Sequence, residues 1–145
     1  MENLSIVQLR EKLLKKEISS RQLVEYYIEQ IEKKDDQLNA YITVNKQQAL
    51  EKADYFDNNF ETESKKKLGG IPLGIKDIFS TKDILTTAAS QMLDDYNPIY
   101  ESTVTQKLLD EGAIFIGKTN LDQFCHGSST ITSYYGPTRK IGRAS

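Results

Sequence analysis

Residues 69–79 read GGIPLGIKDIF, an apolar run that carries one lysine, Lys76. The alternation predicts a β-strand over 71–77, because successive side chains of a strand point to opposite faces. One face then holds the side chains at 71, 73 and 75, and the other holds Pro72, Gly74 and Lys76. A charged lysine is costly to bury. The place of Lys76 is therefore the question on which the function depends.

Two interpretations of Lys76 follow from this stretch. Gly74 has no side chain and leaves space beside the lysine stem, so the amine either extends to water or is sealed in. Loss of water favours the neutral amine, and a neutral lysine amine is a general base. Asp77 follows and points the other way. It caps a turn or pairs with a base, and nothing in the sequence makes it catalytic.

A second apolar run, AIFIG at 113–117, has the length of a buried strand. The segment 102–111 between the two predicted strands should be a helix. Its inward residues would be Val104, Leu108 and Leu109, and Gly112 would end it in the left-handed conformation. Strand, connection with a helix, and strand predict an α/β fold with a mixed sheet of buried strands flanked by helices.

The first half of the chain is typical of helices. Ser5 with Gln8, and Ser19 with Gln22, each have the spacing of a capping box, which satisfies free backbone N–H groups at a helix start. Apolar residues follow at helical spacing, at Ile6, Leu9 and Leu13 and then at Leu23, Val24, Tyr27, Ile28 and Ile31. Asn45 starts a third helix with an inner face of Ala49, Ala53, Phe56 and Phe60.

The remaining segments are predicted to be extended or irregular. Residues 38–44 (LNAYITV) form a short extended candidate, 61–67 (ETESKKK) a solvated loop, and 86–100 a turn-rich loop. A short helix is expected near 121–127. We divide the chain into an N-terminal helical region, 1–67, and the start of an α/β core, 68–145.

Composition excludes several classes of protein. The 145 residues suffice for one domain, and a net charge of −2 argues against broad contact with nucleic acid. No apolar run approaches the roughly 20 residues of a membrane span, and the N-terminus lacks the apolar core of a signal peptide. A single cysteine, Cys125, and a single histidine, His126, allow no internal disulfide and no zinc site. We expect a cytoplasmic protein that binds no metal.

Three further motifs have ordinary explanations. Residues 112–119 match the spacing of a phosphate-binding loop, but their spacer AIFI is itself a predicted strand, so we reject that interpretation. Cys125 and His126 are neighbours on a predicted helix and point apart, so we expect packing roles. The segment GSST, 127–130, either presents backbone N–H groups to a substrate or is simply a turn.

Four blocks together resemble the amidase signature family. They read GGIPLGIKDIFSTKDILTTAASQML, YNPIYESTVTQKLLDEGAIFIGKTN, GSST and YYGPTR, and their order and spacing match the family over residues 68–139. TTAASQML and YNPIYESTV look more narrowly like the A subunits of glutamyl-tRNA(Gln) or aspartyl-tRNA(Asn) amidotransferases. The resemblance implies the N-terminal part of the amidase signature fold.

The resemblance also implies site residues. The family uses a Ser–cis-Ser–Lys triad, and its lysine lies in the segment that corresponds to IPLGIKD, so Lys76 carries over as the proton acceptor. This implication favours a sealed-in Lys76. Ser128 and Ser129 match the family's GSS segment and carry over as groups that line the substrate site. The implied activity is hydrolysis of glutamine to release ammonia.

The chain departs from the family pattern in ways that matter. The cis-serine belongs to a block of the GGSSGGSAA kind and the nucleophile follows later, and neither block occurs before Ser145. The tail KIGRAS, 140–145, replaces the expected Asn-Pro-type segment, and we interpret it as a truncation or a change of frame, with a genuine but divergent end as the alternative. Ile131, Cys125 and His126 are smaller departures. A base without a nucleophile cannot run covalent catalysis, so we expect the chain alone to be inactive and to have unpaired sheet edges.

The resemblance implies partners rather than cofactors of this chain. ATP and Mg²⁺ would be used by a partner subunit. The B and C subunits of the amidotransferase would be the partners, and charged tRNA would be bound through the complex. Glutamine would be the ammonia donor. Two alternatives stay open, namely a stand-alone amidase that acts on another amide, and a non-catalytic remnant.

Overall fold

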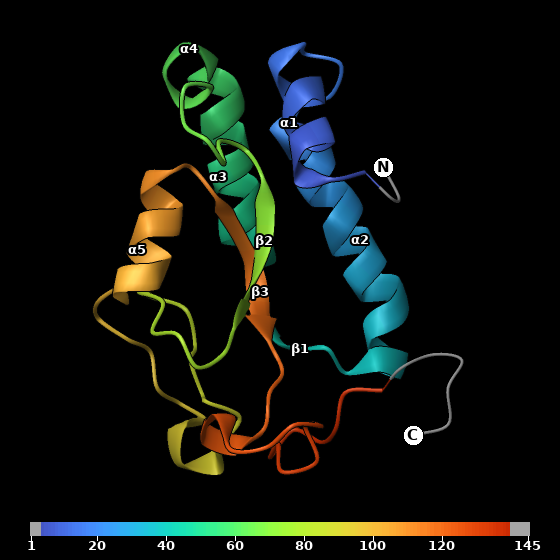
Figure 1. Ribbon diagram of the computed structural model, residues 1–145, viewed down its shortest axis with the longest axis vertical. Coiled ribbons are helices and arrows are strands. Elements are labelled where there is room, and N and C mark those ends of the chain that lie inside the picture. The colour runs from blue at the N-terminus through green and yellow to red at the C-terminus, as the bar shows by residue number, and fades with distance from the viewer. Residues whose placement is uncertain (1–3, 140–145) are drawn as a thin grey trace.

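The computed structural model describes residues 4–139 and contains a three-stranded sheet in the order β1–β3–β2 (Figure 1). The strands are β1 (Tyr41–Val44), β2 (Pro72–Lys76) and β3 (Ile114–Thr119). β2 runs parallel to β3, and β1 runs antiparallel to it. The prediction of a mixed α/β sheet is confirmed. β3 continues two residues past the predicted end at Gly117, which places Lys118 inside the strand.

Helices surround this sheet. They are α1 (Ile6–Leu14), α2 (Ser20–Leu38), α3 (Lys46–Asn58), α4 (Phe60–Glu63) and α5 (Thr103–Asp110), with short 3₁₀ turns η1 (Gln91–Leu93) and η2 (Gln123–Cys125). The two capping boxes at Ser5 and Ser19 are confirmed. Asn45 precedes α3 as predicted, although its side chain makes no cap bond. α4 occupies the start of the segment expected to be a loop, so that prediction is wrong for residues 61–63.

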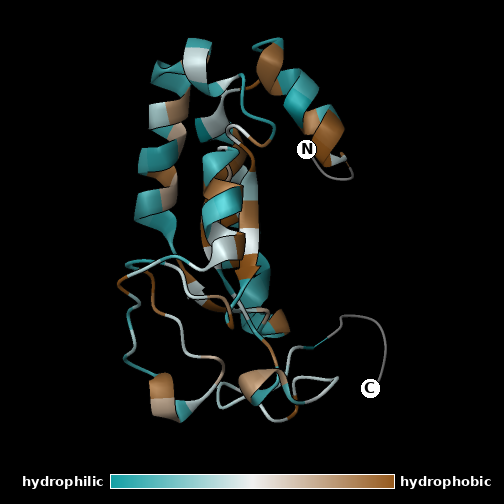
Figure 2. Cartoon of the chain, turned by 60° about the vertical axis from the view of Figure 1, so that its left-hand side comes forward, coloured by the Kyte–Doolittle hydropathy of each residue, from teal (hydrophilic) through white to brown (hydrophobic). Residues whose placement is uncertain are grey.

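One face of the sheet packs against α2 and α3. The core there consists of Val24, Ile28, Ala49, Ala53, Ile114 and Ile116. A neighbouring cluster joins α1 to the amino end of β2 and consists of Leu9, Leu13, Leu23, Phe56 and Ile71. Ile6 shares the helical spacing of Leu9 and Leu13 but is 49% exposed, because α1 buries only one narrow stripe. Figure 2 shows the same pattern, with strands that are mainly brown or white and helices that mix teal with brown.

The opposite face packs against α5. Leu108 and Leu109 pack against Ile75, Ala113 and Phe115, as predicted for the two leucines. Val104 was predicted to face inward and is 47% exposed. Thr105 is buried instead, because its hydroxyl donates a hydrogen bond of 3.0 Å to the carbonyl of Ser80. Gly112 adopts φ +85° and ends the helix in the left-handed conformation that was predicted.

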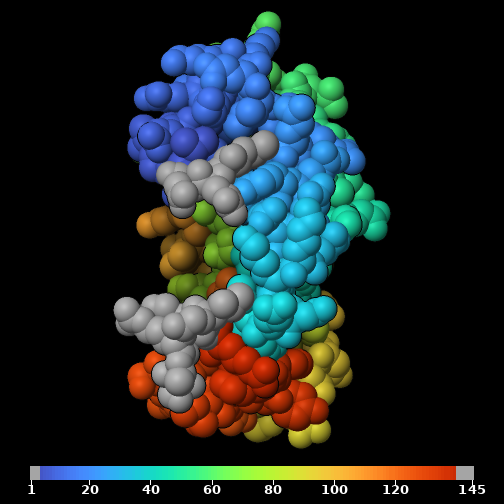
Figure 3. Space-filling model, turned by 90° about the vertical axis from the view of Figure 1, so that its right-hand side faces the viewer, coloured from blue at the N-terminus to red at the C-terminus, as the bar shows by residue number. Residues whose placement is uncertain are grey.

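The helical N-terminal region and the later residues share the sheet, since β1 belongs to the first and pairs with β3 of the second. Figure 3 shows α1 and α2 stacked above residues 121–139 on the right-hand side of the molecule. Between residues 4 and 139, none of the helices has the length and apolar character that crossing a membrane requires. The tail 140–145, including Ser145, lies outside the described residues.

Candidate active site

Lys76 is the last residue of β2, and it is exposed. The expectation of a sealed-in lysine is therefore wrong for this chain. Its neighbours Ile75 and Asp77 are both buried, on the face that packs against α5 and its connecting loop. Because the pleat alternates, Lys76 points to the other face, which α2 and α3 cover farther toward the amino end of the strands.

The space that Gly74 was expected to leave for the lysine stem is also occupied. A Cβ atom added at Gly74 would lie 2.8 Å from the hydroxyl oxygen of Tyr41. The aromatic side chain comes from β1, two strands away in the sheet order. Gly74 therefore provides room for Tyr41 and not for Lys76.

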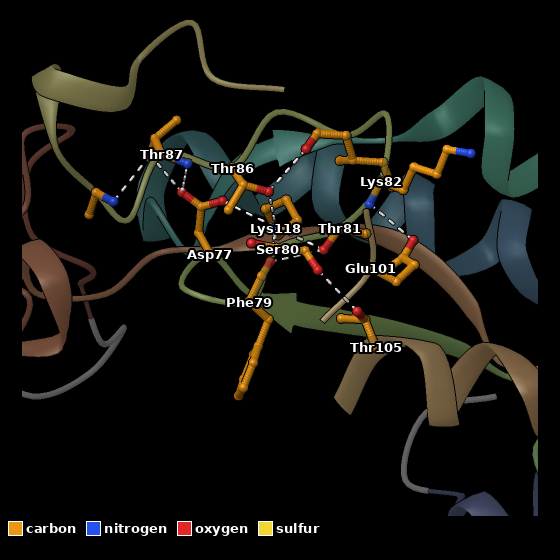
Figure 4. Close-up of polar contacts among 12 residues, drawn as sticks. Asp77, Phe79, Ser80, Thr81, Lys82, Thr86, Thr87, Glu101, Thr105 and Lys118 are labelled. Carbon is orange, nitrogen blue, oxygen red and sulfur yellow. Dashed lines mark hydrogen bonds and ion pairs between the residues drawn. The ribbon is translucent and has the colours of Figure 1, made fainter. Parts of the chain in front are cut away.

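The buried lysine of the described chain is Lys118, whose exposed fraction is 0%. Its Nζ atom donates hydrogen bonds to the carbonyl of Phe79 at 2.8 Å, to the hydroxyl of Thr81 at 3.0 Å and to that of Thr86 at 2.7 Å (Figure 4). Three acceptors match the three N–H donors of an ammonium group. The nearest carboxylate oxygen, Oδ1 of Asp77, lies 3.5 Å away.

Asp77 combines the two roles that the sequence left open. Its Oδ2 accepts hydrogen bonds from the backbone N–H of Thr87 at 2.9 Å and from the hydroxyl of Thr87 at 2.6 Å, which shapes the turn that follows. Its Oδ1 pairs with the cation of Lys118. Burial lowers the pKa of Lys118, and the charge of Asp77 opposes that shift. The pair anchors residues 77–87 directly after Lys76.

The sequence contains a signal for the burial of Lys118. An inward position in an apolar strand predicts burial whatever residue occupies it, but the predicted strand ended at Gly117, one residue too early. The rejection of a phosphate-binding loop is confirmed, because Lys118 lies within β3 and contacts oxygens of the protein itself.

The GSST segment is organised by Asp122. One carboxylate oxygen accepts the backbone N–H groups of Ser129 at 3.1 Å and Thr130 at 2.9 Å, and the other accepts the hydroxyl of Thr132 at 3.0 Å. These bonds, that from Thr130 first, hold the pKa of Asp122 below its ordinary value. Ser128 and Ser129 are exposed on the outside of this turn.

Cys125 and His126 are not packing residues, so that prediction is wrong. Both are exposed, because Phe124 and Cys125 adopt φ of +51° and +62° and the chain turns sharply there rather than continuing as a helix. His126 places its Nδ1 2.8 Å from the carbonyl of Phe124.

The segments that follow β2 and β3 interlock at the carboxyl end of the sheet (Figure 1). The N–H of Phe124 donates to the carbonyl of Ala88 at 2.9 Å, and the N–H of Tyr134 donates to that of Ala89 at 3.0 Å. Ala88 and Ala89 are buried with φ of +51° and +53°, a strained arrangement that concentrates at functional sites. Lys76 and the GSST turn thus belong to the same end of the sheet, as expected for a ligand site between parallel strands.

This end of the sheet carries amines, hydroxyls and backbone N–H groups. Among residues 4–139, histidine, cysteine and carboxylate side chains form no cluster of three or more that could hold a metal ion. An amine and a hydroxyl-rich turn at one end of a sheet suit proton transfer and the binding of a polar amide.

Comparisons with known proteins show which family the chain resembles. The family model described as Amidase matches residues 22–140. The A subunit of the glutamyl-tRNA(Gln) amidotransferase of Allorhizobium ampelinum is 44% identical over 142 residues, which are 98% of this chain and 29% of that protein. The chain thus spans less than a third of the length of this relative.

Two solved structures share the fold. The A subunit of the glutamyl-tRNA(Gln) amidotransferase of Thermotoga maritima superposes with a TM-score of 0.74 at 31% identity, over 94% of this chain and 27% of that one. The native peptide amidase of Stenotrophomonas maltophilia gives a TM-score of 0.84 at 26% identity, over 94% of this chain and 29% of that one. Since the family model covers most of the sequence, the chain belongs to the amidase family.

Proposed function

We propose that this chain contributes the lysine of a Ser–cis-Ser–Lys triad in the glutamine-hydrolysing A subunit of a tRNA-dependent amidotransferase. The observation that carries the proposal is the 44% identity to such a subunit over 98% of the chain, with Lys76 at the carboxyl end of β2. The whole activity needs the family's serine blocks, which the 145-residue sequence does not contain.

The chemistry that we assign to Lys76 is proton transfer. The neutral amine accepts a proton, through the cis-peptide serine, from the serine nucleophile, whose oxygen attacks the side-chain carbonyl carbon of glutamine. The C–N bond then breaks, the same proton is returned to the nitrogen, and ammonia leaves. Water hydrolyses the resulting ester to glutamate and frees the serine.

Exposure of Lys76 fits this role only when another segment covers it. A charged, hydrated amine is a poor base, and removal of water by a covering segment favours the neutral form. In the proposed enzyme the residues that carry the two serines form that cover. The chain alone is therefore expected to release no ammonia from glutamine.

The remaining assignments follow the same proposal. Ser128 and Ser129 line the substrate site, and the chain itself holds no cofactor. ATP and Mg²⁺ are used by a partner subunit, the B and C subunits are the partners in the complex, and charged tRNA is bound through that complex. The product is Gln-tRNA(Gln) or Asn-tRNA(Asn), made in the cytoplasm.

A graft tests the function. Residues 4–139 replace the matching segment of the Thermotoga maritima protein, and ammonia release from glutamine is measured in the presence of that enzyme's partner subunits. We expect activity that falls at least 100-fold in Lys76→Met and is unchanged in Lys82→Met, since Lys82 is an exposed lysine six residues away. A folded, assembled graft that releases no ammonia, or one that tolerates Lys76→Met, contradicts the proposal.

A stand-alone amidase is the second candidate. The specific observation in its favour is the higher TM-score to the peptide amidase, 0.84 against 0.74 for the amidotransferase protein of Thermotoga maritima. Co-purification separates the two candidates, because the amidotransferase protein retains a B-type partner and a stand-alone amidase does not. The DNA downstream of codon 145 also separates both from a non-catalytic remnant, which has no serine blocks in any frame.

A further inference from the structure

Three side chains form a row across the sheet at its carboxyl end. Thr119 of β3 pairs with Tyr41 of β1 on one side and with Lys76 of β2 on the other. Residues that pair directly on adjacent strands point to the same face. Tyr41, Thr119 and Lys76 therefore share the face that points away from α5.

Two glycines lie beside this row and form a slot. Gly74 pairs with Gly117, and neither carries a side chain that could fill the space above the sheet. A Cβ atom at Gly117 would lie 2.9 Å from Cδ1 of Tyr41, and one at Gly74 would lie 2.8 Å from the hydroxyl oxygen of Tyr41. Both distances are shorter than a normal contact, so the tyrosine ring lies directly on Gly117 and its hydroxyl oxygen lies directly on Gly74.

The backbone around Tyr41 is held firmly. The carboxylate of Asp35 accepts the N–H of Ala40 at 2.8 Å and that of Tyr41 at 3.2 Å. The carbonyl of Ala40 accepts the N–H of Asn120 at 2.8 Å. The hydroxyl of Tyr41, by contrast, makes no hydrogen bond with any of residues 4–139. Packing of the ring, rather than a polar contact of the hydroxyl, sets its position.

The filled slot limits where Lys76 can go. Gly74 is two residues before Lys76 on the same face, about 7 Å along the strand, which a lysine stem can span. An open glycine slot would attract the methylene groups of that stem, since lysine stems lie along apolar surfaces. The side chain of Tyr41 already occupies the surface of Gly74 and Gly117, so the stem of Lys76 cannot lie there.

We propose that Tyr41 is a positioning residue for Lys76: the side chain of Tyr41 fills the Gly74–Gly117 slot and keeps the lysine amine at the carboxyl end of the sheet. The catalytic use of that amine rests on the proposed function, whereas the geometry does not. Phenylalanine keeps the ring over Gly117 and lacks only the hydroxyl oxygen beside Gly74, so it retains most of the filling.

The experiment is NMR spectroscopy on the 145-residue chain, with nuclear Overhauser contacts measured from the ε-protons of Lys76. We expect no contact with the α-protons of Gly74 or Gly117 in the wild-type chain, and none with those of Gly117 in Tyr41→Phe, which keeps the ring. In Tyr41→Ala the slot is open, and contacts to both glycines should appear. A general loss of structure does not produce this result, since it removes contacts rather than creating two specific new ones.

Contacts from Lys76 to either glycine in the wild-type chain overturn the proposal. So does an identical contact pattern in the wild-type chain, Tyr41→Phe and Tyr41→Ala. If Tyr41→Ala does not fold, Tyr41→Leu takes its place, and weaker contacts of the same kind are expected because leucine fills only part of the slot. Failure of the proposed function is seen separately, as a graft without glutaminase activity, and leaves this measurement unaffected.

Discussion

Lys118 and Lys76 lie on neighbouring strands at the same end of the sheet, yet their surroundings differ in every respect. Lys118 is fully buried, and its amine contacts three neutral oxygens and one carboxylate. Lys76 is exposed, and the structure gives its amine no hydrogen bond within the described residues. The two residues are offset by one position in the register, since Lys118 pairs with Ile75.

This difference separates two kinds of lysine. The charge of Lys118 is satisfied within the chain, so it stabilises the loop 77–87 and has no free donor for a substrate. The amine of Lys76 is available, and the anchored loop begins at the next residue. Lys118 thus fixes the backbone beside Lys76, and the amine of Lys76 is left exposed for the role that we propose.

The largest expected effect is that of Lys118→Met on stability. The substitution leaves the buried carboxylate of Asp77 without a cation, and breaking a buried pair in this way costs about 3–5 kcal/mol. The measurement is the free energy of unfolding in urea. Lys76→Met is the matched control, and as an exposed substitution it should change stability by less than about 0.5 kcal/mol. Equal losses in the two variants would mean that the burial of Lys118 contributes nothing specific.

The next largest loss of stability is expected from filling the slot at Gly74 and Gly117, on the sheet face to which Lys76 points. Gly117→Ala should destabilise the chain by about 1–3 kcal/mol, because the added Cβ meets the backbone carbonyl of Thr43, which cannot move aside. Gly74→Ala should cost less, since its closest contact is the end of the Tyr41 side chain. Tyr41→Phe should relieve part of the Gly74→Ala loss and none of the Gly117→Ala loss. Unfolding of these single variants and of the two double variants checks this order.

Sequence patterns predicted the elements far better than they predicted which face each element buries. The capping boxes, the left-handed Gly112 and the three strands depend on local chemistry, which a short window of sequence contains. Val104 and Thr105 show where this fails. Apolar spacing favoured Val104, but Thr105 is buried because the distant carbonyl of Ser80 lies against that side of α5.

The exposure of Lys76 could not be predicted for a related reason. Alternation places Lys76 opposite Ile75, but it does not show which segments cover that face or how far along the strand they reach. The slot filled by Tyr41 depends on a residue far from Lys76 in the sequence and on the pairing of two glycines. Resemblance to the family implies a role for Lys76, which stays a prediction, and it describes a larger protein than the 145 residues.

A smaller loss of stability is expected from removing the N-terminal cap of α2, a helix that packs on the sheet face to which Lys76 points. The hydroxyl of Ser19 accepts the N–H of Gln22 at 3.0 Å at the start of α2. Ser19→Ala should therefore lower the free energy of unfolding by about 1 kcal/mol, whereas Ser128→Ala, at an exposed position of the GSST turn, should leave it unchanged. A loss of the same size in both variants would place the effect outside the helix cap.

The smallest effect is local and depends on pH. Hydrogen bonds from the GSST turn, that from Thr130 first, hold the pKa of Asp122 below its ordinary 3.8. The stabilisation is therefore complete above pH 3.8 and is lost as the pH falls through the lower pKa of the folded chain. The amide signals of Ser129 and Thr130, followed by NMR, should shift together over this acid range. Asp122→Asn should abolish the shift, because an uncharged amide does not titrate, and a shift that persists in that variant assigns the transition to another carboxylate.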